Sequence, residues 1–233
     1  MKNQRPYIIC HMTTSVEGKV TGDFLSSPDT QDAIDEYYRI NRDLRCDGYI
    51  CGRVTMEGSF TGGYYPDLTE FNGVEVPDGD FIAEKNGFYA VAFDRRGRLG
   101  WQSGKIEDAD PGYDNAHIIE VLNTADKRYL AYLRSIGVSY IFAGKDGELD
   151  VEYALLKLKE FFGIEKLLLE GGSIINGAFL QANCVDELSL VVAPVTADED
   201  GMPLFSDGTS KTFSLKKAEH LGKNILHLQY DLC

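Results

Sequence analysis

Two adjacent glycines follow an apolar run that ends in a glutamate, in the stretch "LLLEGGSIINGAFLQ". Side-chain packing gives no reason for the pair Gly171-Gly172, whereas glycine lets the backbone approach a ligand closely. If a strand ends at Glu170 and a helix begins near Ser173, the free N–H groups and the helix dipole favour an anion there, such as a pyrophosphate. A tight strand-to-helix turn in which Ser173 is only a cap is the alternative.

A second stretch, "YICGRVTMEGS", again places a glycine between a strand candidate and a helical turn. After Gly52, the guanidinium of Arg53 and the hydroxyl of Thr55 suit a phosphate monoester such as a 2′-phosphate. Arg95 and Arg96, just past another strand end, could add to the same positive corner. The alternatives are a solvated Arg53 with Thr55 near a cap, and a charged surface turn.

A third stretch, "MTTSVEGKVTG", predicts a strand that leaves the core and enters a tight turn containing Ser15. Glu17 and Lys19 would offer one acceptor and one cation to a polar substrate, and Gly18 would permit its close approach. A polar turn between two strands explains the same residues without a ligand.

Composition excludes several classes of partner. The 233 residues carry a formal net charge of −14, which argues against nucleic acid and anionic membranes as general partners. A small anionic ligand would therefore need local positive groups. No apolar run reaches the roughly 18 residues of a membrane span, and the basic start lacks a signal-peptide core. We expect a cytoplasmic protein.

The five cysteines are scattered and form no CxxC pair: Cys10, Cys46, Cys51, Cys184 and Cys233. Neither a disulfide framework nor a metal site is predicted from this spacing. Reduced thiols, most of them buried, are the expected state.

Strand-like apolar segments alternate with segments of helical periodicity along most of the chain. The clearest helix is predicted over Val151–Phe162, with Asp150 as its cap and Gly163 at its end. Other helices are predicted at Thr30–Leu44, Lys127–Ile136 and Ser173 to about Ala182, with a helical turn near Thr55–Gly58. Strands are predicted at Tyr7–Thr13, Tyr49–Cys51, Phe88–Phe93, Ala116–Leu122, Val138–Ala143, Lys166–Glu170 and Glu187–Ala193.

The end of the chain departs from this alternation. Thr212–Leu221 and Asn224–Leu232 predict an antiparallel hairpin joined at Gly222-Lys223. The pattern indicates one three-layer α/β domain over residues 1–233, with a mainly parallel sheet and an antiparallel C-terminal hairpin. "DRRGRLGW" predicts a turn followed by a weak strand.

One long segment, residues 61–87, interrupts the pattern with glycine, proline, aspartate and aromatic side chains. Loops of this length inside a compact domain are often lids or binding loops. A binding lid and a dimer arm both remain open as interpretations of this insertion.

Taken in chain order, these stretches resemble the reductase domain at the C-terminus of the riboflavin biosynthesis protein RibD, a relative of dihydrofolate reductase. The similar stretches are "RPYIICHMTTSVEGKV", "CDGYICGRVT", "AFDRRGRL", "LLLEGGSIINGAFLQANCVDEL" and "APVTADEDGMPLF". The fourth is the most specific, and the order of all five strengthens the resemblance, which runs from Arg5 to Phe205.

The resemblance implies a dihydrofolate reductase-like fold and an NADPH-dependent reductase. It places the cofactor pyrophosphate at Gly171 and Gly172, and the 2′-phosphate near Gly52, Arg53 and Thr55. It also implies a small-molecule substrate and a homodimer.

In the same family, Ser15, Glu17 and Gly18 fall where the substrate and nicotinamide pocket is lined. Glu17 stands where the family has an aspartate, and His11 where it has a lysine. Glu17, protonated in a dry pocket or acting through a water, is the first candidate proton donor. His11 is the second, and a strand histidine bonded to a neighbour is its alternative interpretation.

The expected reaction is hydride transfer from NADPH to a C=N or C=O carbon of a pyrimidine- or pterin-like substrate, as in the 5-amino-6-(5-phosphoribosylamino)uracil reductases. A dihydrofolate-type or broad carbonyl reductase is one alternative. A non-catalytic nucleotide-binding protein on the same fold is another, because fold does not fix function.

Overall fold

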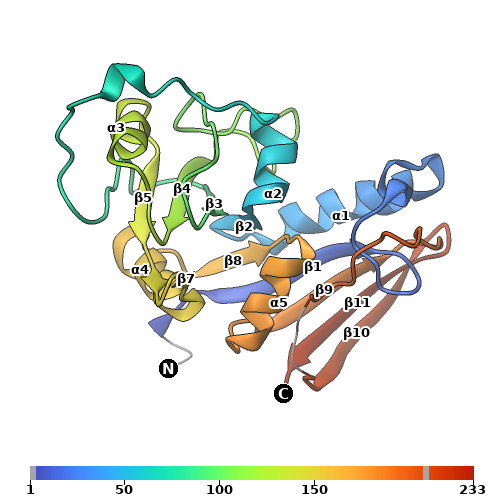
Figure 1. Cartoon of the computed structure of the whole chain (residues 1–233). Helices are drawn as coiled ribbons and strands as arrows, with labels where there is room; N and C mark the ends of the chain where they lie inside the picture. The colour runs from blue at the N-terminus through green and yellow to red at the C-terminus, as the bar shows by residue number, and fades with distance from the viewer. Residues whose placement is uncertain (1–3, 207–209) are drawn as a thin grey trace. The chain divides into compact units, whose positions relative to one another are not determined.

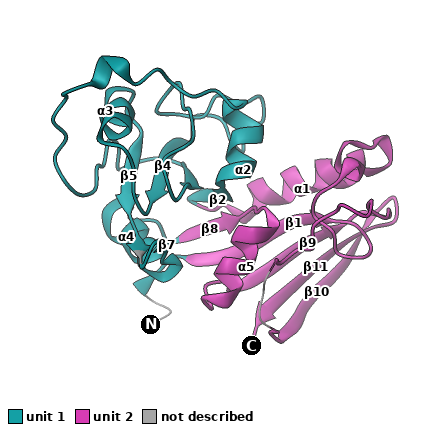
Figure 2. Cartoon of the chain, viewed as in Figure 1, with its two compact units in different colours: residues 1–6, 47–165 teal, residues 7–46, 166–233 magenta. Residues whose placement is uncertain are grey.

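The computed structural model describes residues 4–206 and 210–233. The chain forms two compact units (Figure 2). Unit 1 contains Asp47–Glu165 and the described residues up to Pro6, and unit 2 contains Tyr7–Cys46 and Lys166–Cys233. Each unit has its own hydrogen-bonded strands and helices (Figure 1). The interpretation of the chain as one domain stays a prediction.

Unit 1 contains parallel strands in the order β2 (Gly48–Gly52), β3 (Tyr89–Phe93), β4 (His117–Leu122) and β5 (Ser139–Phe142). These strands are buried along almost their whole length, as expected for parallel strands covered on both faces. The helices are α2 (Arg53–Met56), α3 (Lys127–Ser135) and α4 (Val151–Phe162), and the short strands β6 (Gly144–Lys145) and β7 (Glu148–Leu149) form a small hairpin.

Helix α4 forms where the periodicity predicts it. The side chain of Asp150 accepts a hydrogen bond from the Tyr153 N–H at 3.0 Å, and Gly163 ends the helix with a left-handed φ of 69°. Helix α3 is capped in the same way by Asp126, which accepts from the Arg128 N–H. Both caps provide acceptors for N–H groups that a helix start leaves unpaired.

The insertion at residues 61–87 is part of unit 1 (Figure 2). Its ring contacts reach α3, where Tyr65 stacks on Tyr129 and Phe71 meets Tyr132 edge-on. The backbone of Phe81 exchanges two hydrogen bonds with Tyr140 on the edge strand β5. The insertion therefore packs along α3 and β5 in this structure. The binding-lid and dimer-arm interpretations both stay predictions.

Unit 2 contains strands in the order β10 (Phe213–Gly222), β11 (Ile225–Leu232), β9 (Glu187–Val192), β1 (Tyr7–Thr14) and β8 (Lys166–Leu169). Strand β1 is parallel to β8 and β9, whereas β11 is antiparallel to β9 and β10. The helices are α1 (Gln31–Leu44) and α5 (Ser173–Gln181), with short 3-10 turns at Asp23–Ser26 and Pro28–Thr30.

Strand β1 presents alternate side chains to opposite faces, as the strand period requires. His11 contacts Tyr37 of α1 on one face, and Met12 approaches Gly171 before α5 on the other. Strand β1 therefore has α1 on one side and the segment that leads into α5 on the other.

The predicted mainly parallel strands and antiparallel C-terminal hairpin are confirmed. The hairpin loop is Lys223-Asn224, one residue later than predicted, because both residues take the positive φ of a two-residue turn. The prediction of a weak strand after "DRRGRLGW" is wrong. The residues that follow it make only an isolated bridge, between Lys105 and His117. No helix among the described residues is long and apolar enough to cross a membrane.

Candidate functional site

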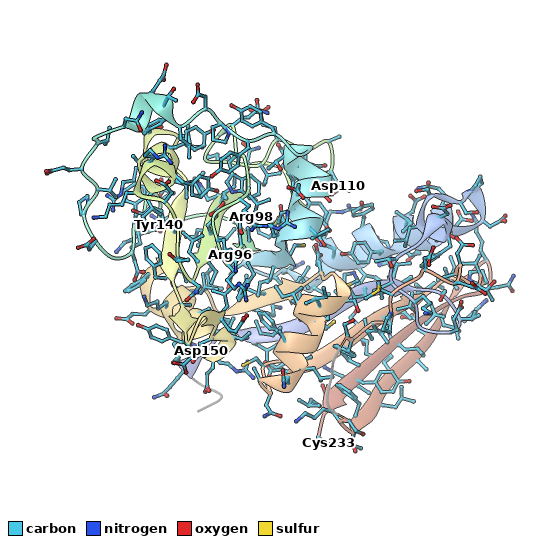
Figure 3. The ribbon with its side chains drawn as sticks, in the orientation of Figure 1. Arg96, Arg98, Asp110, Tyr140, Asp150 and Cys233 are labelled. Atoms are coloured by element: carbon cyan, nitrogen blue, oxygen red, sulfur yellow. The ribbon has the colours of Figure 1, made fainter. Side chains whose placement is uncertain are left out.

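A positively charged cavity of about 250 Å³ lies in unit 1, where β2 and β3 end. Its lining residues are Arg53, Phe93, Asp94, Arg95, Arg96 and Arg98. Arg96 and Arg98 are exposed, and neither forms an ion pair with a carboxylate in the part of the chain that the structure describes (Figure 3). In a chain of net charge −14, this cavity gathers the local positive groups that an anionic ligand would need.

The residues Arg95 to Arg98 form a loop, here called the arginine loop, that is held in place by Asp94. The Asp94 carboxylate is 1% exposed and accepts hydrogen bonds from the N–H groups of Arg96, Arg98 and Leu99. Gly97 takes a left-handed φ of 64°, and a Cβ there would lie 2.7 Å from the Tyr129 ring. The loop is therefore fixed in a conformation that directs its arginines away from the core.

The predicted 2′-phosphate residues are only partly brought together. Arg53 lines the cavity, but its guanidinium already forms a 2.7 Å ion pair with Glu57 one helical turn away. Gly52 caps α2, and neither Gly52 nor Thr55 lines the cavity. The sequence identified Arg95 and Arg96 as possible additions and missed Arg98, although the run "DRRGR" contains it.

The glycine pair lies in unit 2 between β8 and α5, as predicted. Gly171 takes a left-handed φ of 84°, and a Cβ at this position would lie 3.1 Å from the Met12 methyl group. Gly172 caps α5 without any side-chain hydrogen bond to the helix start. The first N–H groups of α5 thus lack intrahelical acceptors and a capping side chain, which leaves them suited to an anion. The peptide bond between the two glycines is cis.

Ser173 does not fill its predicted role as a capping or ligand-facing hydroxyl. Its side chain is 4% exposed and donates a hydrogen bond to the Pro203 carbonyl. The reason is that Ser173 faces the 194–206 region, which the sequence alone does not place beside α5. Asn176, one turn further, is also buried, and its Oδ1 has no hydrogen-bond partner among the described residues.

The predicted turn at Ser15–Lys19 forms and is tied to a second loop of unit 2. The Ser15 hydroxyl accepts from the Lys19 N–H at 3.0 Å, and Gly18 has a left-handed φ of 83°. Lys19 Nζ donates to the Gly201 carbonyl at 2.6 Å. The Lys19 ammonium is thus occupied by the protein and is not presented to a substrate in this conformation.

Glu17 and His11 differ from what a proton donor requires. Glu17 is exposed and accepts a 2.7 Å hydrogen bond from the Ala197 N–H, which lowers the pKa of its carboxyl. A protonated Glu17 in a dry pocket is therefore a wrong expectation, because solvent and this N–H favour the ionised form.

His11 follows its alternative interpretation as a bonded strand histidine. It is 0% exposed, stacks on Tyr37, and bonds the Tyr37 carbonyl through Nε2 and Ser189 through Nδ1. Burial lowers the pKa of His11 to about 4, so the ring is neutral and satisfied within the core.

A second cavity, of about 610 Å³, lies in unit 2 beside the Ser15–Lys19 turn and is lined by Val16, Asp23, Asp29 and Asp198 among others. Its lining contains no lysine or arginine. This cavity suits hydrogen-bond donors of a ligand and disfavours a phosphate.

Three exposed apolar side chains stand inside the three predicted ligand segments, a feature that the sequence motifs did not single out. Val16, Val54 and Ile174 are 60%, 68% and 72% exposed. Each follows directly on a predicted binding residue: Ser15, Arg53 and Ser173. Exposed apolar groups at such positions are available to ring-shaped ligands.

A family model for the RibD C-terminal domain matches residues 6–227. Over 232 residues, the chain is 24% identical to the 2,5-diamino-6-ribosylamino-4(3H)-pyrimidinone 5′-phosphate reductase of Methanothermobacter thermautotrophicus, covering 95% of this chain and 96% of that protein. It is 32% identical to the Aquifex aeolicus protein of the same name over 112 residues, which are 48% of this chain and 46% of that protein.

Solved structures share the fold at lower sequence identity. A pyrimidine reductase-like protein from Corynebacterium diphtheriae superposes with a TM-score of 0.69 at 16% identity, covering 98% of this chain and 92% of that one. Acinetobacter baumannii RibD gives a TM-score of 0.65 at 19% identity, where the match covers 99% of this chain and 59% of the longer RibD chain.

Proposed function

The chain belongs to the RibD C-terminal domain family, and on that premise we propose that it is an NADPH-dependent reductase. The proposed reaction is hydride transfer to a C=N or C=O carbon of a small pyrimidine- or pterin-like substrate. Two curated relatives are named as reductases of a ribosylaminopyrimidinone 5′-phosphate, which supports a substrate of the riboflavin-pathway type.

The cavity lined by four arginines is the observation that favours NADPH over NADH as the cofactor. The 2′-phosphate that distinguishes NADPH from NADH is a dianion, for which guanidinium groups are the preferred partners. Arg96 and Arg98 are the principal ligands in this proposal, because Arg53 is partly neutralised by Glu57 and Arg95 by Glu148.

The start of α5 fits the cofactor pyrophosphate. Gly172 leaves the first N–H groups of α5 without a capping side chain, and the nine-residue helix adds its dipole. Gly171, just before it, is held against Met12 by its left-handed backbone. In this proposal Ser173 binds the pyrophosphate through its backbone N–H, because its hydroxyl is bonded to the Pro203 carbonyl.

The nicotinamide ring, when bound, supplies the hydride, and the protein supplies position and electrostatics. We propose that Ser15, Glu17 and Gly18 line the substrate side. Glu17 acts there as a carboxylate that holds a water or a substrate N–H, because its lowered pKa keeps it ionised. Such positioning accounts for several kcal/mol of a hydride-transfer barrier.

The decisive experiment compares NADPH and NADH binding by calorimetric titration. Arg98→Ala should lower the affinity for NADPH about tenfold, because one charge-assisted contact is worth roughly 1.4 kcal/mol or more. It should change the affinity for NADH less than about twofold. Arg53→Ala should have a smaller effect than Arg98→Ala.

Arg39→Ala is the matched control, since Arg39 is an exposed arginine of α1 that pairs with Glu36 and Asp43. An equal loss of NADPH and NADH affinity in Arg98→Ala would remove the 2′-phosphate assignment. Cofactor binding without NADPH oxidation on any carbonyl, imine, pterin or ribosylaminopyrimidine would favour the non-catalytic alternative.

A further inference from the structure

A buried carboxyl group lies behind the arginine loop. Glu120 on β4 is 0% exposed, and its Oε1 lies 2.6 Å from the indole nitrogen of Trp101 and 2.5 Å from the hydroxyl of Tyr129. The same Tyr129 hydroxyl lies 2.6 Å from the Leu99 carbonyl. The other carboxyl oxygen, Oε2, has no hydrogen-bond partner among the described residues.

Counting protons decides the state of this cluster. The Leu99 carbonyl only accepts, and a phenol has one proton, so Tyr129 cannot donate both to Leu99 and to an ionised Glu120. If Glu120 carries a proton on Oε1, it donates to the Tyr129 oxygen and still accepts from Trp101. Tyr129 then donates to Leu99, and each of the three short contacts has its own proton.

We propose that Glu120 is a neutral carboxylic acid that positions the arginine loop by holding Tyr129 on the Leu99 carbonyl. The positioning role rests on the proposed function, whereas the protonation state does not.

The electrostatic surroundings agree with the neutral form. Burial, and secondarily the charge of Asp94, raise the pKa of Glu120 well above its usual range. The other polar groups that face it are Tyr129 from α3 and Trp101 after β3, and Tyr65 of the 61–87 segment stacks on Tyr129. No cation is among these groups.

Tyr129 connects the carboxyl group to the loop at two points. Its hydroxyl fixes the carbonyl of Leu99, whose N–H is held by Asp94 at 2.9 Å. Its ring underlies Gly97, where a Cβ would be 2.7 Å away. Leu99, which directly follows the arginine loop, is thus held at both its N–H and its carbonyl. The hold on the carbonyl requires the Glu120 proton.

The protonation state is tested first, by infrared difference spectroscopy of wild type against Glu120→Gln. At about pH 7.5, wild type should show the carbonyl stretch of a protonated carboxylic acid that Glu120→Gln lacks, although a glutamate in water has a pKa near about 4.3. Absence of that band would overturn the proposal whether or not the protein binds NADPH.

The pH dependence of unfolding gives a second, independent readout. Below about pH 4 both the folded and the unfolded Glu120 are protonated; as pH rises, the unfolded state ionises and the folded state does not, so stability falls until the raised pKa is passed. Glutamine has no such titration and cannot both donate and accept through one atom. The stability advantage of wild type over Glu120→Gln should therefore shrink as pH rises, and growth of that advantage would contradict the proposal.

Tyr129→Phe tests the positioning step, with Tyr140→Phe as the control. Both tyrosines are 0% exposed, but the Tyr140 hydroxyl bonds Arg134 and not the cluster. Tyr129→Phe should lower the affinity for NADPH about fivefold, which corresponds to the loss of one ordinary hydrogen bond. It should affect the affinity for NADH less, and it should also shift the Glu120 infrared band.

Failure of each proposal has a separate signature. If wild type does not bind NADPH, the proposed function fails while the infrared band still reports Glu120. If wild type binds NADPH and Tyr129→Phe shifts the band without a selective loss of NADPH, the positioning role is overturned and the proposed function stands.

Discussion

His11 shows how burial changes the use of an ionisable side chain. A histidine in the first strand is a reasonable candidate proton donor from its type alone. The structure surrounds it with a carbonyl, a hydroxyl and a stacked tyrosine, so both ring nitrogens are used internally. A charged His11 would be desolvated, and this burial outweighs the Tyr37 and Ser189 carbonyls, which by themselves favour the charged ring.

We predict that His11 makes the protein acid-sensitive. Its folded pKa of about 4 lies below the ordinary histidine value of 6.5, so its stabilising effect is complete above about pH 6.5 and is lost as pH falls toward 4. The full loss is on the order of 3 kcal/mol. Chemical denaturation of wild type and His11→Gln should show a stability difference that narrows over this range; a constant difference would contradict the prediction.

The sequence predicted which residues lie at the strand ends, because glycines and arginines after apolar runs are local signals. It could not predict their partners. Arg53 pairs with Glu57, the Ser173 hydroxyl bonds the Pro203 carbonyl, and Glu17 accepts from the Ala197 N–H. The last two partners are distant in the chain. Glu120 carried no local signal at all, since its cluster is formed by residues from separate elements.

At the scale of elements, the 61–87 segment is tied to unit 1 by a charged contact. Asp80 and Lys157 form a 2.8 Å ion pair whose side chains are only 16% and 13% exposed. Asp80 also accepts the N–H of Phe142 at the end of β5. A segment that moves as a lid would have to break this pair.

We predict that Asp80→Ala destabilises the protein by about 2 kcal/mol, because it leaves the Lys157 ammonium uncompensated in a mostly buried position. Asp78→Ala is the control in the same segment, since its 3.6 Å pair with Lys127 is exposed and should contribute less than about 0.5 kcal/mol. The measurement is urea denaturation of both variants. Equal effects would show that the pair does not hold the segment.

Helices and strands were predicted closely because their apolar periodicity is strong and local. The path of the 61–87 segment was not, because it depends on ring contacts of Tyr65 and Phe71 with α3 that have no periodic signal. The aromatic content did indicate that the segment is not simply disordered.

The chain as a whole has a formal net charge of −14, whereas four of its arginines line a single cavity. Because a net charge of this size disfavours anionic ligands in general, we expect an anion to bind at this cavity. The homodimer stays a prediction; β10 is an exposed edge strand that carries Leu215 at 59% exposure.

Among the buried titratable groups, His11 lies in unit 2 and Glu120 lies in unit 1. Acid should thus loosen one half of the chain and alkali the other. Hydrogen-exchange protection at about pH 5 should be lost first around β1 and β9, and at about pH 8.5 first around β4 and α3. The same order of opening at both pH values would mean that neither group sets the weak point of its unit.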